Sequence, residues 1–238
     1  MGQAPGDYRL MTDTKDMFAS ISRRYDLLNH ILSLGFDFYW RKCLFKLASP
    51  YLTGETSSVL DIASGTGDVA FTFTELEKVK IFSSDFCFDM LSIAKSKSRI
   101  YKKPVFFVCT DGEALNFKDK SFNVVTNAFA LRNIQNLNKS FSEMKRVLKP
   151  GGICLSLEFT RPNNIFIKPF FLLYLNLILP VIGKCFSGNY KAYKYLSSSI
   201  QAFMPPGELC ELIGNTGFNK VRYMTLAPGV VNIYIAEG

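Results

Sequence analysis

The chain has 238 residues, 48% of them hydrophobic, which is enough for the core of one large α/β domain and excludes an intrinsically disordered protein. Its six cysteines are scattered, with no C-x-x-C pair and no histidine cluster, so we expect no zinc site and no disulfide framework, but reduced thiols in a cytoplasm. The formal net charge of +8 is compatible with a nucleic acid, an anionic membrane or an acidic ligand as partner.

The N-terminal part is predicted to be a tail followed by helices. Residues 1–14 are polar and lack the apolar core of a signal peptide, so we expect a flexible tail. From 15 to 52, apolar residues recur every three or four positions, with a break at Gly35, which predicts two helices.

Short β-rich runs then alternate with helical stretches, which is typical of a parallel sheet with crossover helices. Two further strands close the chain as a hairpin around Pro228 and Gly229. The sequence therefore predicts a single α/β domain over 15–238, with a mainly parallel seven-stranded sheet, a C-terminal antiparallel strand and an N-terminal helical extension. The predicted strands are 58–64, 80–85, 105–111, 122–131, 152–159, 220–227 and 230–237.

A glycine turn follows the first strand, in the string VLDIASGTGD at 59–68. Gly65 and Gly67 allow the backbone to approach a ligand, and the helix that begins near Asp68 offers free N–H groups. Asp85 ends the next strand 18 residues after Gly67, close to the spacing at which a carboxylate accepts both ribose hydroxyls in doubly wound folds. These features indicate a nucleoside-containing ligand.

The third strand ends at Asp111 and Gly112, where an acid can accept a hydrogen bond from an adenine amino group. The turn lacks both the G-x-G-x-x-G and the G-x-x-x-x-G-K patterns, so a pyrophosphate is not expected. Each of these features, taken alone, is also common in turns and helix caps that bind no ligand. Three strand ends that converge on one crevice nevertheless fit S-adenosylmethionine as cofactor.

Around these residues the chain resembles a class I S-adenosylmethionine-dependent methyltransferase with a Rossmann-like fold. Four further strings together narrow the resemblance to the ubiquinone/menaquinone biosynthesis C-methyltransferase family, of the demethylmenaquinone methyltransferase type. They are RRYDLLNHILSLGFDFYWRK at 23–42, ALRNI at 130–134, MKRVLKPGG at 144–152 and LEFTRP at 157–162.

The resemblance implies methyl transfer to a ring carbon of a prenylated demethylquinol, with demethylmenaquinol as the expected acceptor. It implies cofactor contacts at Thr66 in the glycine turn, at Asp85 and at the Asp111–Gly112 pair. It divides the domain into a cofactor-binding half at 58–160, an apolar substrate or lid region at 161–219 and a closing hairpin at 220–238. The chain has Asp37, Ala128 and Tyr234 where the family commonly has His, Ser and His, so a histidine-dependent proton transfer is not expected there.

The expected catalytic side chains are Glu158 and Arg132. Glu158 ends the fifth strand, where a desolvated carboxylate could act as a base, although pairing with Arg132 or Arg161 is an equal alternative. Arg132 could stabilise a quinolate oxygen. The chain's one histidine, His30, is expected to be a surface or capping residue more than a base.

Between Glu158 and Glu208 the chain has no acidic residue but five basic ones, which flank the uncharged run 169–183. This run is shorter than the roughly 20 residues that span a bilayer. It fits either a buried crossover helix or a peripheral contact with an anionic membrane at the cytoplasmic face. Nucleic acid is not an expected partner, because the charge is interleaved with apolar residues. Another small-molecule or RNA methyltransferase, or a non-catalytic quinone-binding or cofactor-binding relative, remains the alternative.

Overall fold

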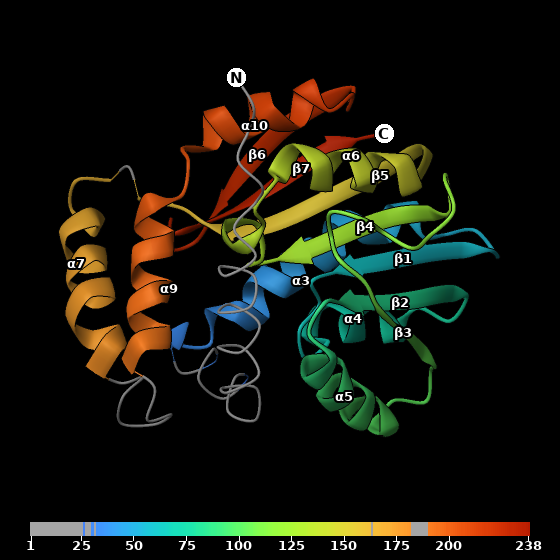
Figure 1. Ribbon diagram of the computed structural model, residues 1–238, viewed down its shortest axis with the longest axis horizontal. Coiled ribbons are helices and arrows are strands. Elements are labelled where there is room, and N and C mark those ends of the chain that lie inside the picture. The colour runs from blue at the N-terminus through green and yellow to red at the C-terminus, as the bar shows by residue number, and fades with distance from the viewer. Residues whose placement is uncertain (1–25, 27–29, 31, 163, 182–189) are drawn as a thin grey trace, which may run out of the picture.

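The computed structural model describes residue 26, residue 30 and the ranges 32–162, 164–181 and 190–238 (Figure 1). The predicted tail at 1–14 and nearly all of the helix predicted before Gly35 lie outside the described residues. The second predicted N-terminal helix is present as α3 (Phe36–Ala48), followed by the short turn η2 (Ser49–Tyr51).

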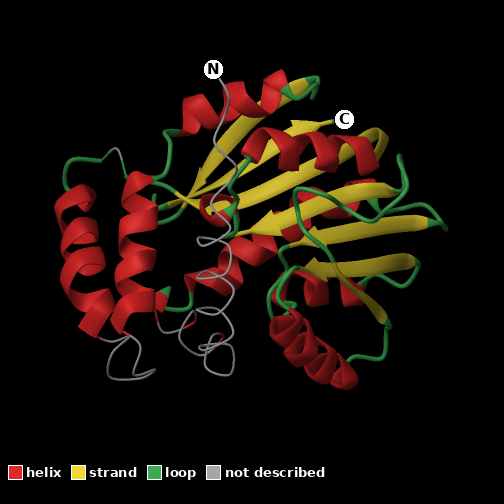
Figure 2. Cartoon of the chain, in the orientation of Figure 1, coloured by secondary structure: helices red, strands yellow, loops and turns green. Residues whose placement is uncertain are grey.

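One mixed sheet forms the centre of the molecule, in the order β3-β2-β1-β4-β5-β7-β6 (Figure 2). The first five strands in the chain pair in parallel, and β7 runs antiparallel to both of its neighbours, β5 and β6. The predicted sheet and its closing hairpin are therefore confirmed. The strands are β1 (Ser57–Ile62), β2 (Val79–Asp85), β3 (Val105–Cys109), β4 (Phe122–Ala128), β5 (Leu148–Phe159), β6 (Lys220–Leu226) and β7 (Val231–Glu237).

All seven strands differ from their predicted bounds by at least one residue, and the two largest differences, in β4 and β5, have local reasons. β4 ends at Ala128 rather than at 131, because Phe129 takes a left-handed backbone with φ of 57° that a strand cannot continue. β5 begins at Leu148 rather than at 152, because Leu148 already pairs with Phe122 ahead of a shift in register.

Helices cover both faces of the sheet and bury one hydrophobic core on each. The first core joins β1, β4, β5 and β7 to α3 and α4 through residues such as Trp40, Leu44 and Ala70. The second core joins the opposite face to α6 and α10. The remaining elements are α4 (Asp68–Thr72), η3 (Phe73–Glu75), α5 (Phe88–Lys97), η4 (Ser98–Ile100), η5 (Leu131–Asn133), α6 (Leu137–Val147), α7 (Ile167–Leu173), η6 (Tyr174–Ile178), α9 (Tyr190–Ala202) and α10 (Pro206–Asn215).

The helices α7 and α9 lie side by side beyond the carboxyl ends of β1, β4 and β5 (Figure 1). They belong to the region 161–219, whose last helix, α10, packs instead into the second core through Leu209 and Ile213. Over the described residues, each helix is too short or too polar to cross a membrane. In a doubly wound sheet, ligands bind outside the carboxyl ends where the strand order reverses, here between β1 and β4.

Candidate active site

The glycine turn between β1 and α4 has backbone geometry that depends on its sequence. Gly67 has φ of 88°, and a Cβ there would lie 2.9 Å from the ring of Phe71, so only glycine fits without displacement. Ala63, at the start of the turn, also takes a left-handed φ, of 50°. A non-glycine residue with such a backbone is strained, and strain of this kind is concentrated at functional sites.

Asp85, at the end of β2, holds this turn. One carboxylate oxygen accepts from the backbone N–H of Gly65 at 2.8 Å, and the other accepts from that of Cys87 at 2.8 Å. Burial raises the pKa of Asp85, and these backbone donors offset part of the effect. Asp85 and Gly65 line a cavity of about 280 Å³ that also reaches β3 and η5.

The far end of this cavity is formed by Asp111 and Gly112, after β3. Asp111 accepts from the N–H of Glu113 at 2.9 Å. A Cβ at Gly112 would approach Ile62 to 3.3 Å. The predicted residues Gly65, Asp85, Asp111 and Gly112 therefore line one cavity, although they come from three separate strand ends.

Thr66 and Gly67, which were also predicted as cofactor contacts, do not line this cavity. The hydroxyl of Thr66 donates to the carboxylate of Asp26 instead. Lys97 of α5 binds Asp26 at 2.7 Å and also pairs with Asp68. Burial alone would lower the pKa of Lys97, but Asp68 and Asp26 raise it above its ordinary value.

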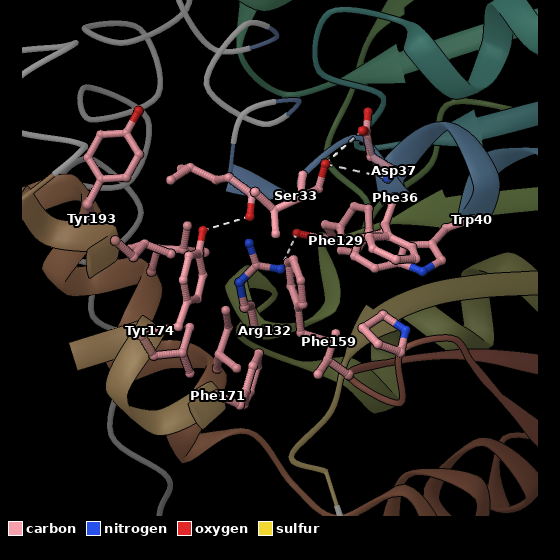
Figure 3. Close-up of a pocket in the computed structure, with 18 of the residues that line it drawn as sticks. Ser33, Phe36, Asp37, Trp40, Phe129, Arg132, Phe159, Phe171, Tyr174 and Tyr193 are labelled. Atoms are coloured by element: carbon pink, nitrogen blue, oxygen red, sulfur yellow. Dashed lines mark hydrogen bonds between the residues drawn. The ribbon is translucent and has the colours of Figure 1, made fainter. Parts of the chain in front are cut away.

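A second cavity, of about 390 Å³, lies between α3, η5, α7, η6 and α9 (Figure 3). Its lining is mainly aromatic and aliphatic, which suits an apolar ligand. Rings of Trp40, Phe129 and Phe159 contact one another there, with centroids 4.6 to 6.1 Å apart. Other apolar lining residues are Phe36, Ile167, Phe171, Tyr174, Leu175, Leu179, Leu196 and Ile200.

The two cavities share part of their lining. Phe129, Arg132, Asn133 and Tyr195 line both of them. The first three follow β4, and Tyr195 comes from α9. A group held in the first cavity can therefore meet a group held in the second across these four residues.

Arg132 lies at this junction, close to Phe159 in Figure 3, and forms a buried ion pair with Glu158. One terminal nitrogen of Arg132 lies 2.7 Å from Glu158 and 2.6 Å from the carbonyl oxygen of Phe129. The Nε–H of Arg132 is buried without a hydrogen-bond partner among the described residues. Glu158 also accepts from the N–H of Phe159 at 2.9 Å and lines neither cavity, which matches the pairing alternative for this residue.

His30 lies away from the junction. Its Nδ1 is 2.5 Å from Asp37, which also accepts from Ser33 at 2.7 Å and from Arg41 at 2.5 Å. Burial would raise the pKa of Asp37, but these three partners together hold it below its usual value. His30 stacks on Phe38 and lines neither of the two cavities, so its position agrees with the expected structural role.

Of the four junction residues, only Arg132 was predicted from the sequence as a site residue, whereas Phe129, Asn133 and Tyr195 were not. Phe129 is marked in the sequence only by its place after β4, and Tyr195 reaches the junction through a contact between residues 62 positions apart. In the sequence, Asn133 and Tyr195 are polar residues with no pattern that assigns them to a site.

The first cavity fits S-adenosylmethionine by the chemistry of its lining. Asp85 has lone pairs left for ribose hydroxyls beyond its two backbone donors. Asp111 offers a carboxylate that can accept from an amino group of a base, and Gly65 and Gly112 leave room for a ligand against the backbone.

The comparisons with known proteins agree with this geometry. A model of the ubiE/COQ5 methyltransferase family matches residues 8–237. The chain is 40% identical to a demethylmenaquinone methyltransferase of Deinococcus radiodurans, over 94% of this chain and 91% of that protein. It is 38% identical to one of Thermus thermophilus, over 93% and 99%. It is also 31% identical to the bovine mitochondrial 2-methoxy-6-polyprenyl-1,4-benzoquinol methylase, over 92% and 76%.

Solved structures share the fold at low sequence identity. Phosphoethanolamine N-methyltransferase 2 of Haemonchus contortus, in complex with S-adenosyl-L-methionine, has a TM-score of 0.62 and 17% identity, over 83% of this chain and 51% of that one. A SAM dependent methyltransferase from Aquifex aeolicus has a TM-score of 0.56 and 16% identity, over 81% and 87%. The predicted Rossmann-like methyltransferase fold is thus confirmed.

Proposed function

The chain belongs to the ubiE/COQ5 methyltransferase family and is an S-adenosylmethionine-dependent methyltransferase, and from this premise we propose that it methylates a ring carbon of a prenylated demethylnaphthoquinol. Relatives that are 34–40% identical over most of the chain are named demethylmenaquinone methyltransferases, which supports a naphthoquinol acceptor. The benzoquinol methylase is less similar, at 31% identity.

The observation that carries the proposal is the junction of the two cavities. The first is lined by carboxylates and glycines from the strand ends, and the second is lined by aromatic and aliphatic side chains. A flat ring with an apolar tail fits the second cavity, and its ring can face the first cavity beside Phe129 and Arg132. Alignment of this kind provides much of the rate gain in a bimolecular transfer.

The residues of the first cavity would bind and orient the cofactor. We assign the ribose hydroxyls to Asp85, the adenine to Asp111 and Gly112, and the methionyl part to the turn around Gly65. Thr66 and Gly67 act from the other side of the turn, where they hold its shape. When bound, the cofactor would supply an activated methyl group on a sulfonium sulfur, for transfer to a ring carbon in exchange for that carbon's proton.

Arg132 and Glu158 would raise the reactivity of the acceptor together. The cationic guanidinium at the junction favours the ionised form of a nearby quinol hydroxyl, which places electron density on the ring carbon. Its Nε–H is buried and has no hydrogen-bond partner among the described residues. Glu158 acts through Arg132, because it lines neither cavity and fixes the guanidinium at 2.7 Å.

We further propose that the prenyl tail enters from an anionic membrane surface beside α7 and η6. One side of this helical segment lines the second cavity through Phe171 and Leu175. The other side exposes Phe166, Leu173 and Leu177. In this proposal, one side of the segment is buried against the second cavity and the other side faces the membrane. The two interpretations of the apolar run, a buried helix and a membrane-facing one, then both apply, each to one side.

The experiment is transfer of a labelled methyl group by the purified protein to prenylated demethylnaphthoquinol and to prenylated demethylbenzoquinol, side by side. We expect turnover with the naphthoquinol to exceed turnover with the benzoquinol. The reverse order would move the acceptor to the benzoquinol class. Cofactor binding with no turnover on either acceptor would favour the non-catalytic alternative.

A further inference from the structure

Tyr195 lies at the junction of the two cavities but has no role in the proposed function described above. It lies on α9, is half-buried, and lines both cavities. Its hydroxyl donates to Oδ1 of Asn133 at 3.0 Å, and Asn133 also lines both cavities. A side chain from the apolar helices thus reaches the residue next to Arg132.

This hydrogen bond fixes the orientation of the side-chain amide of Asn133. A carboxamide carries an acceptor oxygen on one side and two N–H donors on the other. Because the tyrosine hydroxyl engages the oxygen, the N–H donors are turned to the opposite side. Without the hydroxyl, the amide can rotate and exchange its donor end for its acceptor end.

The helix α9 is in turn fixed to the helical segment that lines the second cavity, which we call the acceptor cavity. Ser197 and Gln201 of α9 bind the side chain of Asn176 in η6 at 3.3 and 2.8 Å. The neighbouring residue Leu175 of η6 lines the acceptor cavity. Tyr195 therefore connects the wall of the acceptor cavity to η5, the element that carries Arg132 and Asn133.

We propose that Tyr195 is a positioning residue for methyl transfer, which fixes the Asn133 amide so that its N–H donates to an oxygen of the acceptor ring. This inference rests on the proposed function. Arg132 favours charge on the ring, whereas the fixed amide sets the ring's rotation, so that the accepting carbon faces the first cavity. Loss of the hydroxyl lowers the fraction of bound acceptor in a reactive orientation, with little effect on how tightly either ligand binds.

The test is Tyr195→Phe in the full-length protein, which removes the hydroxyl and keeps the ring. We expect kcat to fall about tenfold, with KM for the acceptor and Kd for S-adenosylmethionine changed less than about twofold. The matched control is Tyr223→Phe, at an exposed position on β6, which should leave kcat unchanged. In an Asn133→Ala background, Tyr195→Phe should cause no further loss, because both changes remove the same interaction.

Wild-type kcat in Tyr195→Phe, or losses that multiply in the double variant, would overturn this role. Failure of the proposed function is a separate result, seen as lack of turnover by the wild-type protein on either quinol. In that case the contact is measured by the ¹⁵N NMR signal of the Asn133 side-chain amide, identified by its absence in Asn133→Ala. A signal that shifts in Tyr195→Phe but not in Tyr223→Phe supports the positioning contact, and a signal that does not shift refutes it.

Discussion

Among single residues, Glu158 offers the clearest test of how the acceptor is activated. In Glu158→Gln, Arg132 stays buried but loses its charged partner, and an unpaired buried charge costs about 3 to 5 kcal/mol. We expect a lower free energy of unfolding by roughly this amount and a kcat reduced about tenfold, because the guanidinium is held less firmly.

The shape of the pH–rate profile separates the two roles of Glu158. If this residue acts through Arg132, the variant keeps the profile of the wild type at a lower rate. If the variant instead loses one limb of that profile, Glu158 is a general base and the positioning role is wrong. Unfolding in denaturant and steady-state kinetics on the same preparations provide both measurements.

Asp61 in β1 predicts a dependence of stability on pH. It is fully buried, accepts from the Thr126 hydroxyl at 2.8 Å, and has an oxygen without a hydrogen-bond partner among the described residues. Burial raises its pKa from 3.8 to about 7, against the lowering effect of Thr126. Between these two values the folded protein binds more protons at Asp61 than the unfolded chain does, so this residue's contribution to stability decreases as pH rises.

The variant Asp61→Asn removes this titration. From about pH 5 to about pH 8, we expect its unfolding free energy to rise relative to the wild type by roughly 2 to 3 kcal/mol. The control is Asp89→Asn, at an exposed position on α5, which should follow the wild type across the range. Parallel curves for Asp61→Asn and the wild type would contradict the raised pKa.

At this residue scale, the sequence predicted the lining of the cofactor cavity better than the lining of the junction. Gly65, Asp85, Asp111 and Gly112 follow strands, and the topology of a parallel sheet brings strand ends together. Tyr195 reaches the junction by a packing contact that has no local signal in the sequence. Thr66 was placed correctly in the turn, but the direction of its side chain depends on Asp26, 40 residues away.

Among the elements, α4 and α5 are joined to the segment before Gly35 by a group of alternating charges. Lys97 at the end of α5 binds Asp26 and Asp68, and Arg41 of α3 binds Asp68 at 3.0 Å. Asp26 in turn accepts from Thr66 in the glycine turn. Asp26 is thus coupled to the glycine turn that borders the first cavity.

We predict that Lys97→Met weakens this connection. Loss of a partly buried cation between two carboxylates should lower the unfolding free energy by about 1 kcal/mol. It should also raise the Kd for S-adenosylmethionine about threefold, because the turn loses support at Thr66. Lys95→Met, on an exposed position of the same helix, is the control for both calorimetry and unfolding. An equal effect of the two substitutions would show that the ion pairs do not support the turn.

Elements with a strong periodic pattern could be assigned correctly as helix or strand from the sequence. Their predicted bounds were wrong where tertiary contacts change the local backbone. β4 ends three residues early, because the backbone at Phe129 turns away toward the junction. The run at 169–183 has the composition of a buried helix. Which side of this run is buried depends on its packing against α9, and the sequence pattern does not predict the position of α9.

For the molecule as a whole, the apolar segment formed by α7 and η6 lies beside the acceptor cavity. This position offers a physical reason for the concentration of basic residues between Glu158 and Glu208. The described part of the acid-free stretch exposes Arg161, Lys168 on α7 and Lys194 on α9, the helix beside α7 (Figure 1). Basic and apolar side chains on one surface suit an anionic bilayer, to which each basic residue adds about 1 kcal/mol of attraction. This surface adjoins the cavity in which the prenylated ring is proposed to bind.

The proposed contact of this surface with a membrane predicts a selective loss in Phe166→Ser/Leu173→Ser. Both side chains are exposed and neither lines the acceptor cavity, so the fold and the site should be preserved. Binding to vesicles that contain anionic lipid, measured by sedimentation, should weaken about thirtyfold, because about 2 kcal/mol of apolar burial is lost. Turnover of a long-chain acceptor in those vesicles should fall in parallel, whereas a short-chain acceptor in detergent should be methylated at the wild-type rate.

The control for this loss is Phe88→Ser, which removes an equally exposed aromatic ring from α5. It should leave vesicle binding unchanged, because α5 packs beside β2 and β3, well apart from α7 (Figure 1). Higher salt should weaken the binding of the wild type, since the basic side chains are exposed and screened. Equal vesicle binding by the double variant and the wild type would mean that the acceptor reaches its cavity by a route that does not involve this surface.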